Sequence, residues 1–274
     1  MNELAGRPVD RRSYDPEFFG HLFAVEDRHF WFRARNRAIA TVIRQIEPRL
    51  KSGYKVLEMG CGTGNVLRVL EQHCARGTVV GMDLFAEGLR YARRRTSCML
   101  VQGDVNAPPF AARFDLIGLF DLLEHLADDV SVLHAIHDML APEGTLLLTV
   151  PAHPSLWSYF DSASRHRRRY DPAELETKLS LAGYRVEYLT QYMASIYPWV
   201  WLRRGFSALV DRRAASDVDR AAELAANELR VRPVFNELLA CLLSAEARLI
   251  ARRRRLPIGT SLLAVERKRG AAAA

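Results

Sequence analysis

Three acidic side chains follow three consecutive short apolar stretches, at the points where parallel strands would end. Glu58 stands near the end of KVLEM, Asp83 closes GTVVGMD and Asp104 closes CMLVQGD. In an open α/β sheet, ligands bind outside the carboxyl ends of the strands. A carboxylate there can hold a cationic amine, accept hydrogen bonds from two ribose hydroxyls, or accept one from the amino group of adenine. The three residues therefore predict a site for an adenosine that carries a cationic amine.

The glycine-rich turn VLEMGCGTGNV, residues 56–66, distinguishes this ligand from a dinucleotide. The dinucleotide fingerprint has glycines at the spacing GxGxxG and places a pyrophosphate on the N-terminus of the next helix. Here Asn65 takes the third glycine position, and the negative charge of Glu58 beside the turn opposes a pyrophosphate. An adenosine with an amino-acid tail and no phosphate satisfies both observations, and S-adenosylmethionine is such a ligand. An NAD enzyme is the least favoured alternative.

With these residues the chain resembles the class I S-adenosylmethionine-dependent methyltransferases, nearest the small-molecule group that includes the ubiquinone and menaquinone methyltransferases. The resemblance covers about residues 55–192 and the last strand, and it rests on LEMGCGTG, the acidic end of GMD, the GDV turn and FDLLEHL. It implies a doubly wound, mostly parallel seven-stranded sheet of Rossmann-like methyltransferase type, whose last strand runs antiparallel beside the sixth. It also implies S-adenosylmethionine as cofactor and a small-molecule acceptor, without identifying that acceptor.

The glycine turn and the strand ends supply the expected cofactor-binding residues, which are Glu58, Gly60, Cys61, Gly62, Asp83, Leu84, Asp104, Val105 and Asp121. Asp121 could contact the methionine amine or have only a strand-end role. By the resemblance, Glu124 and His125 lie beside the cofactor, and a structural role at a helix start is the alternative. The four cysteines lack paired metal spacing, so we expect no metal site, and they indicate reduced thiols in a cytoplasmic protein.

The acceptor site should come largely from the loop after the fifth strand. Methyl transfer from a sulfonium needs the acceptor atom in line with the bond from sulfur to the methyl group, so positioning can supply much of the acceleration. A hydroxyl acceptor would gain from a general base. His166 in SRHRRRY is the candidate base, and Arg168 or Arg169 could bind an anionic acceptor. The other expected acceptor-binding residues are His153, Trp157, Tyr159 and Tyr170.

Aromatic and arginine residues are dense in EDRHFWFRARNR, residues 26–37. Aliphatic residues at helical spacing over 39–46 mark the inward face of a helix, and the same face carries Arg35 and Trp31 further back. Arg35 could pair with the methionine carboxylate, and Trp31 could lie over the cofactor or the acceptor. Core packing of Trp31 and a surface position of Arg35 are the open alternative.

Short apolar strands alternate with amphipathic helices, which favours a parallel sheet covered on both faces. The expected strands are 55–59, 77–83, 98–104, 114–121, 144–150, 184–192 and 259–268, with helices from about 63 and over 86–95, 128–140 and 172–182. Asp171, Pro172 and Glu174 predict a capping box at the start of the helix over 172–182. Tyr170 precedes this cap and could pack on Leu175 as a hydrophobic staple, which is the alternative to a role in acceptor binding. We expect an N-terminal helical cap (1–50), a core (51–192), a mainly helical insertion (193–256) and a last strand with a tail (257–274).

The 274 residues carry a net charge of +7, nearly all of it from arginine, and 49% are hydrophobic. Such a surface can bind phosphates, carboxylates or anionic lipid. A nucleic-acid methyltransferase is a lesser alternative, since FDLLEHL replaces the NPPY-type turn of DNA amino-methylating relatives and no nucleic-acid-binding module is recognisable. A scaffold that binds the cofactor without catalysis is another. We expect neither a signal peptide nor a membrane-spanning segment.

The insertion begins with SIYPWVWLRRGF, residues 195–206, in which aromatic residues directly precede two arginines. This composition is typical of a segment at a membrane interface. A helix over 233–252 is expected to carry one apolar stripe and to end at Arg252–Arg255, consistent with anionic lipid nearby; the stripe comprises Phe235, Leu238, Leu239, Leu242, Leu249 and Ile250. A peripheral membrane contact is thus one hypothesis. Packing on the sheet or a homodimer interface is the other.

Overall fold

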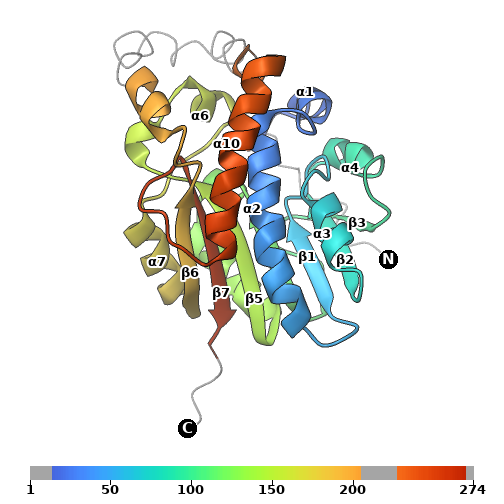
Figure 1. Ribbon diagram of the computed structural model, residues 1–274. Helices are drawn as coiled ribbons and strands as arrows, with labels where there is room; N and C mark the ends of the chain where they lie inside the picture. Colours follow the sequence, from blue (N-terminus) through green and yellow to red (C-terminus); the bar gives the residue numbers. More distant parts are fainter. Residues whose placement is uncertain (1–13, 205–226, 270–274) are drawn as a thin grey trace.

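The computed structural model describes residues 14–204 and 227–269 (Figure 1), so residues 205–226 of the expected insertion and both termini lie outside the described residues. A seven-stranded sheet runs in the order β3-β2-β1-β4-β5-β7-β6. Its strands are β1 (Lys55–Met59), β2 (Thr78–Asp83), β3 (Met99–Gln102), β4 (Phe114–Phe120), β5 (Leu140–Pro151), β6 (Tyr184–Tyr192) and β7 (Ser261–Lys268).

The strand directions confirm the predicted fold class. β1 to β5 pair in parallel, whereas β7 lies between β5 and β6 and is antiparallel to both. All seven expected strands are present, with ends that differ by a few residues. β5 begins earlier than expected because Leu140 already pairs with Phe114, before an irregularity in the register.

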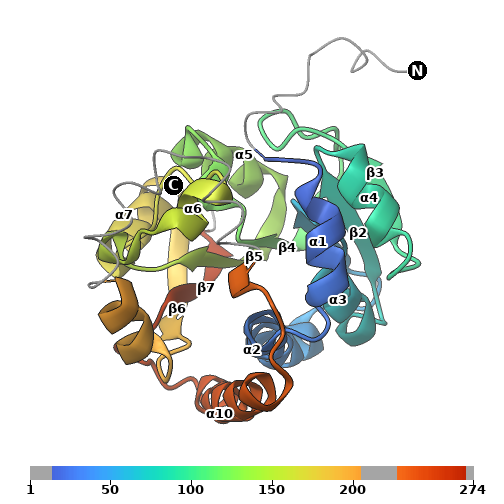
Figure 2. The same cartoon turned by 90° about the horizontal axis from the view of Figure 1, so that it is seen from above.

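Helices cover both faces of the sheet (Figures 1 and 2). The α-helices are α1 (Phe18–Val25), α2 (Phe30–Ile46), α3 (Leu67–His73), α4 (Ala86–Ala92), α5 (Asp129–Met139), α6 (Tyr159–Ala163), α7 (Pro172–Leu181) and α10 (Pro233–Ala251). Short 3-10 helices are η1 (Glu47–Arg49), η2 (Leu123–His125) and η3 (Pro154–Leu156). Among the described residues, no helix is long and apolar enough to cross a membrane.

Two hydrophobic cores lie on opposite faces of the sheet, because successive strand residues point to opposite sides. Val56 belongs to the core under α2, α3 and α10, whereas Leu57 belongs to the core under α5 and α7. The predicted inward face of α2 is confirmed, since Ile39, Val42 and Ile43 are fully buried in the first core. α2 therefore packs on the sheet as part of its covering layer.

The residues of the predicted apolar stripe of α10 divide between exposed and packed positions. Phe235, Leu238, Leu242 and Leu249 are between 39% and 64% exposed, and the buried face consists of Asn236, Ala240, Leu243, Glu246, Ala247 and Ile250. The polar pair on this face binds backbone groups. Asn236 accepts a hydrogen bond from the N–H of Phe30, and Glu246 accepts from the N–H groups of Ala194 and Ser195. These contacts allow polar side chains to be buried where the helix meets its neighbours.

The predicted capping box at α7 is wrong, although Asp171 occupies the N-cap position and Pro172 begins the helix. The Asp171 side chain makes no capping hydrogen bond and instead lies 3.7 Å from Nδ1 of His153. Glu174 pairs with Lys178 one turn further along the helix, at 3.0 Å. Both carboxylates therefore have partners outside the cap.

Candidate functional site

A cavity of about 1220 Å³ lies at the carboxyl ends of the parallel strands, the side that Figure 2 shows from above. The glycine turn, the ends of β2 and β4, helices α1 and α2, and the loop after β5 all contribute to its lining. Every residue predicted to bind the cofactor lines this cavity. The site therefore lies where the strand order reverses, between β1 and β4.

The glycine turn after β1 folds back onto β2. The N–H groups of Gly60 and Cys61 both donate to the carbonyl oxygen of Met82, at 2.8 and 2.9 Å. Gly60 has φ +74°, and a Cβ there would meet Cδ1 of Leu122 at 2.8 Å. The left-handed backbone favours glycine here, and any other residue would also have to displace the side chain of Leu122. The turn thereby presents its backbone to the cavity.

Asp83 connects the glycine turn to the segment after β2. Its Oδ2 accepts from the N–H of Gly62 at 2.7 Å, and its Oδ1 accepts from the N–H of Phe85 at 2.8 Å. Burial raises the pKa of this carboxyl to about 6, while the backbone donors act in the opposite direction. Each carboxylate oxygen can accept a further hydrogen bond. Asp83 is therefore fixed in position and able to receive two ribose hydroxyls.

Glu58 lies deeper in the cavity and is only 2% exposed. Its Oε2 has no hydrogen-bond partner among the described residues, and burial raises the pKa of the carboxyl well above its usual range. A buried acceptor without a donor is costly. A cationic amine would supply that donor, so Glu58 fits the amino-acid end of S-adenosylmethionine.

Arg35 is buried at the cavity wall and is paired with Asp121. Its Nη1 lies 2.8 Å from Oδ2 of Asp121, and its Nη2 donates to Oδ1 of Asn65 at 3.1 Å. The guanidinium also lies 5.3 Å from the ring centre of Trp31, within the range of a cation–π contact. Asp121 is held further by the hydroxyl of Thr149 at 3.1 Å. Helix α2 is therefore tied to both the glycine turn and the end of β4.

Asp104 and Val105 line the rim of the cavity after β3, as Leu84 does after β2. Oδ1 of Asp104 accepts hydrogen bonds from the backbone N–H and from the side-chain amide of Asn106, each at 2.8 Å. Asp104 therefore also stabilises the turn after β3. Its second oxygen has no hydrogen bond to any described residue that would compete with an adenine amino group.

His166 lines the cavity from the loop after β5, and Asp161 holds its ring. Nδ1 of His166 lies 3.1 Å from Oδ1 of Asp161, and its Nε2 lies 4.0 Å from Oε1 of Glu124. Burial alone would raise the pKa of Asp161, but the hydrogen bond to His166 and the charge of Arg169 hold it below its usual range. This arrangement leaves Nε2 as the ring nitrogen not engaged with Asp161.

Arg169 and Tyr159 also line this end of the cavity. Arg169 is buried and donates to Asp161 at 2.8 Å and to the carbonyl oxygens of Ala152 and Thr260. The hydroxyl of Tyr159 donates to Oε2 of Glu228 at 2.7 Å. Of the two arginines considered for an anionic acceptor, Arg169 faces the cavity.

Four predicted acceptor-binding residues do not line the cavity, namely His153, Trp157, Arg168 and Tyr170. Tyr170 is fully buried in the second core, where its hydroxyl donates to Asp129 at 2.8 Å. The partly exposed side chain of Arg168 binds the same Asp129 carboxylate, at 3.0 Å. His153 turns to Gln191 at 2.7 Å, and Trp157 is 40% exposed to solvent. The structure therefore places these four residues outside the lining of the cavity.

Two contributions to the site were not predicted. Asn65 is buried and accepts hydrogen bonds from both Arg35 and Asn36. A buried network beside the glycine turn joins Oε2 of Glu26 to Thr63 and Arg95, each at 2.5 Å. Polar residues directly after the glycines were the available signal, but their partners lie far away in the sequence.

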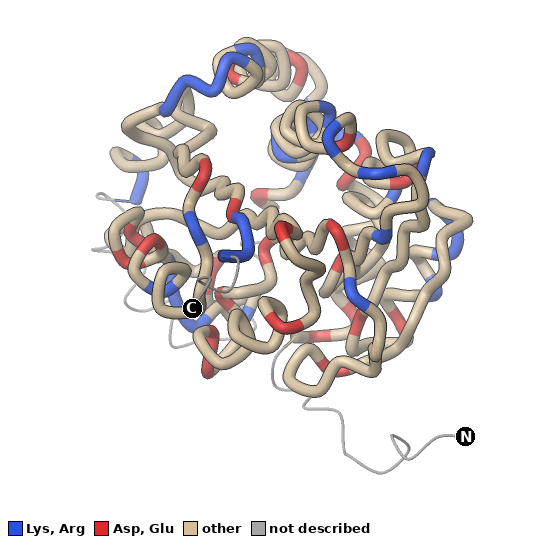
Figure 3. The backbone as a smooth tube through the Cα atoms, turned by 90° about the horizontal axis from the view of Figure 1, so that it is seen from below, with Lys and Arg blue, Asp and Glu red and all other residues tan. Residues whose placement is uncertain are grey.

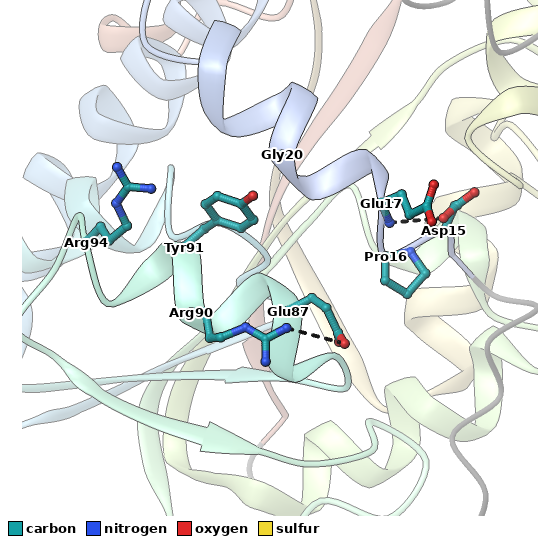
Figure 4. A pocket seen from close by; sticks show the side chains of 8 residues that line it. All are labelled: Asp15, Pro16, Glu17, Gly20, Glu87, Arg90, Tyr91 and Arg94. Carbon is teal, nitrogen blue, oxygen red and sulfur yellow. Dashed lines mark hydrogen bonds and ion pairs between the residues drawn. The ribbon is translucent and has the colours of Figure 1, made fainter.

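A second hollow of about 580 Å³ lies between α1 and the outer side of α4 (Figure 4). Charged residues dominate its lining, and two of them, Arg90 and Glu87, approach to 3.6 Å. None of the predicted site residues lines this hollow. It is therefore separate from the candidate site.

Comparison with solved structures shows the fold. The plantazolicin methyltransferase BpumL in complex with SAH is 14% identical, with a TM-score of 0.59 over 96% of this chain and 94% of that one. The partner of the Trm112 methyltransferase activator in a complex from Haloferax volcanii is 18% identical, with a TM-score of 0.60 over 93% and 97%.

Sequence relatives cover smaller regions. The ubiquinone biosynthesis O-methyltransferase of Erwinia tasmaniensis is 34% identical over 106 residues, which is 35% of this chain and 42% of that protein. The trans-aconitate 2-methyltransferase of Azoarcus sp. is 29% identical over 147 residues, 53% of this chain and 55% of that protein. The matches thus span about half or less of these relatives.

Residues 31–189 match the family described as methyltransferase domain, and this stretch is more than half of the chain. The match confirms the predicted class of protein and S-adenosylmethionine as the cofactor of that class. The cavity described above lies largely within the matched stretch. The chain therefore belongs to the methyltransferase-domain family.

Proposed function

We propose that the protein transfers a methyl group to a small, largely apolar acceptor that carries one polar reacting group. When bound, S-adenosylmethionine supplies a methyl group on a positively charged sulfur. The observation that carries the proposal is the single cavity, in which Glu58 and Asp83 line one part and the pair of His166 and Asp161 another. Cofactor-binding groups and a candidate base thus share one enclosed space.

In this proposal one set of residues binds the cofactor. Glu58 binds the amine of the cofactor, Asp83 binds the ribose hydroxyls, and Asp104 binds adenine. The ion pair between Arg35 and Asp121 supports a role of Arg35 in fixing the part of the cavity wall near the amino-acid end of the cofactor. The methionine carboxylate would share the same guanidinium, which has further N–H groups to donate.

His166 is the proposed base for a hydroxyl acceptor. Asp161 orients the ring through Nδ1, so that Nε2 can accept the hydroxyl proton as the oxygen attacks the methyl group. The relatives named above include an O-methyltransferase of ubiquinone biosynthesis and a methyltransferase for trans-aconitate. Both names support a small-molecule acceptor, and Arg169 beside Asp161 suits an acceptor with a negative group.

The mouth of the cavity supports an apolar acceptor delivered from a membrane surface. Trp199 and Phe235 line the cavity and are 66% and 54% exposed, so they lie at its opening. Trp201 and Leu202 are exposed nearby in the chain, and exposed apolar residues continue along α10. Basic and acidic residues alternate along the backbone in the view from below (Figure 3). The apolar rim is what supports the membrane contact. Gly205 and Phe206 of the same sequence motif lie outside the described residues.

Binding of the cofactor tests the proposal directly. In calorimetry, the protein should bind S-adenosylmethionine and its demethylated product, and Asp83→Ala should weaken both by roughly ten- to a hundredfold, because a charge-assisted hydrogen bond contributes about 1.5–3 kcal/mol. Asp138→Ala is the matched control, since this carboxylate is 85% exposed. Binding of NADH without binding of S-adenosylmethionine would refute the proposal.

A further inference from the structure

Glu124 is a buried carboxylate at the wall of the cavity. The function proposed above assigns it no partner. It has no exposed surface, and neither of its carboxyl oxygens has a hydrogen-bond partner among the described residues. It nevertheless belongs to the cavity lining. A carboxyl group in such a position is either protonated or needs a cation or a donor from the cavity.

Two histidines meet this carboxylate. One ligand atom each from Glu124, His125 and His166 can be chosen so that all three lie within 4.8 Å of one another. The ring centres of His125 and His166 are 4.8 Å apart, and the two ring planes are nearly perpendicular. Two atoms bound to one zinc ion at about 2.1 Å in tetrahedral geometry are about 3.4 Å apart, so the side chains must move closer together when the ion binds.

The surroundings of His166 add an independent feature of a metal ligand. Histidines that bind metals usually give their other ring nitrogen to a carboxylate, which fixes the tautomer and the ring orientation. Asp161 occupies this position at 3.1 Å from Nδ1, and Arg169 holds Asp161 in turn. Nε2 of His166 is thereby directed to the side of Glu124, 4.0 Å away.

We propose that Glu124, His125 and His166 bind a divalent transition-metal ion, with its remaining coordination positions open to the cavity. Two imidazoles and one carboxylate are a ligand set of catalytic zinc and other divalent transition metals, in which solvent or substrate completes the coordination. Because all three residues line the cavity, the open positions face the space proposed for the acceptor. The sequence-based expectation of no metal rested on cysteine spacing, which does not reveal such a site.

The inference rests on the proposed function and narrows the acceptor to one with a hydroxyl oxygen. A cation at this site would lower the pKa of a hydroxyl that binds it. In the transfer, the oxygen lone pair forms the new bond to the methyl carbon, and the bond from carbon to sulfur breaks with its electron pair remaining on sulfur. With Nε2 of His166 engaged by the cation, the hydroxyl proton passes to solvent instead of to the imidazole.

Zinc binding by the full chain tests the proposal without an activity assay. The protein is prepared without a polyhistidine tag and with Cys241→Ser, because Cys241 is an exposed thiol that would bind zinc itself. After treatment with a chelator, calorimetry with Zn²⁺ should show one site per chain. Co²⁺ added to the same protein should give the visible absorption of a low-coordinate nitrogen and oxygen site, whereas Mg²⁺ should bind far more weakly.

Variants locate the site. Glu124→Gln and His166→Asn should each lower the affinity for Zn²⁺ by at least roughly a hundredfold, because even residues that only support metal ligands contribute ten- to a hundredfold. His134→Asn is the control, since this histidine is exposed on α5 and should leave zinc binding unchanged. Should Glu124→Gln not fold, as judged by circular dichroism, His166→Asn alone decides the question.

The affinity for S-adenosylmethionine, measured on the same samples, separates the two proposals. Binding of the cofactor without a zinc site, or zinc affinity equal in all variants, overturns the metal site and leaves His166 as the base. Failure of the wild type to bind S-adenosylmethionine overturns the proposed function whatever the zinc result. A zinc site that disappears with Glu124 and His166 but not with His134 supports the inference.

Discussion

Glu266 lies within β7 with no exposed surface, and neither carboxyl oxygen has a hydrogen-bond partner among the described residues. Burial, with smaller contributions from Glu176 and Glu187, raises its pKa to about 9. A carboxyl whose pKa is higher in the folded than in the unfolded chain stabilises the fold fully below its unfolded pKa of about 4.3. That contribution is lost as the pH rises towards the folded value.

We therefore expect Glu266 to lower the free energy of unfolding by up to about 1.4 kcal/mol per pH unit between about pH 5 and about pH 9. Glu266→Gln is neutral throughout, so the variant should be more stable than the wild type at the alkaline end and less dependent on pH. Urea denaturation across this range measures the difference. Glu143→Gln, at an exposed position, is the control. Parallel pH profiles of wild type and Glu266→Gln would contradict the assignment of a buried neutral acid.

Local sequence predicts single residues well where a strand ends and poorly within a loop. Glu58 and Asp83 were predicted because an apolar strand fixes the position of the residue that ends it. Within SRHRRRY, Arg168 and Arg169 are adjacent, yet one binds Asp129 beside the core and the other faces the cavity. No periodicity in a loop determines which of two neighbours points inwards, so this choice needs tertiary structure.

At the scale of elements, the site depends on close packing of the glycine turn against α4. Gly64 has φ +77°, and a Cβ there would meet Cα of Ala92 at 2.9 Å. Gly53 has nearly the same φ, +78°, but a Cβ there would meet nothing within 4 Å. The two positions therefore separate backbone strain from packing.

Gly53→Ala and Gly64→Ala should both lose about 1–2 kcal/mol for the left-handed backbone. Gly64→Ala should lose more, because α4 must move away from the turn. Since 1 kcal/mol corresponds to about 2–4 °C in a chain of this size class, thermal unfolding should rank Gly64→Ala clearly below Gly53→Ala. Equal melting temperatures would show that the turn and α4 are not packed as described.

Element patterns predicted the sheet better than the helices of the insertion. The central strands β1 and β4 are short and mostly apolar, and their apolar residues are buried in the cores on both faces of the sheet. In α10, the spacing of hydrophobic residues predicted one apolar stripe, but the buried face includes Asn236 and Glu246, which bind the backbone of other segments. The spacing of hydrophobic residues does not show which polar side chains are buried, because their partners are distant in the sequence.

At the scale of the whole molecule, the cavity combines segments that are far apart in the sequence, and its apolar rim comes from two of them. The segment with Trp199 and Trp201 precedes the undescribed residues, and α10 follows them. Exposed aromatic residues around the opening of a largely apolar site suit an acceptor that partitions into lipid. A second copy of the chain could cover the same rim, and the two cases differ in what an anionic membrane does.

Co-sedimentation with phosphatidylcholine vesicles, with and without phosphatidylglycerol, tests the membrane contact. Binding should grow with the anionic lipid and weaken with salt, because each basic residue near such a surface contributes about 1 kcal/mol. The double variant Trp199→Ala and Trp201→Ala should bind less without losing its circular dichroism spectrum. Leu181→Ala removes an apolar side chain that is 66% exposed at the end of α7, as exposed as Trp199, and should bind like the wild type. A wild type that ignores anionic vesicles at low salt but sediments as a dimer, with the tryptophan variant monomeric, would assign the rim to self-association instead.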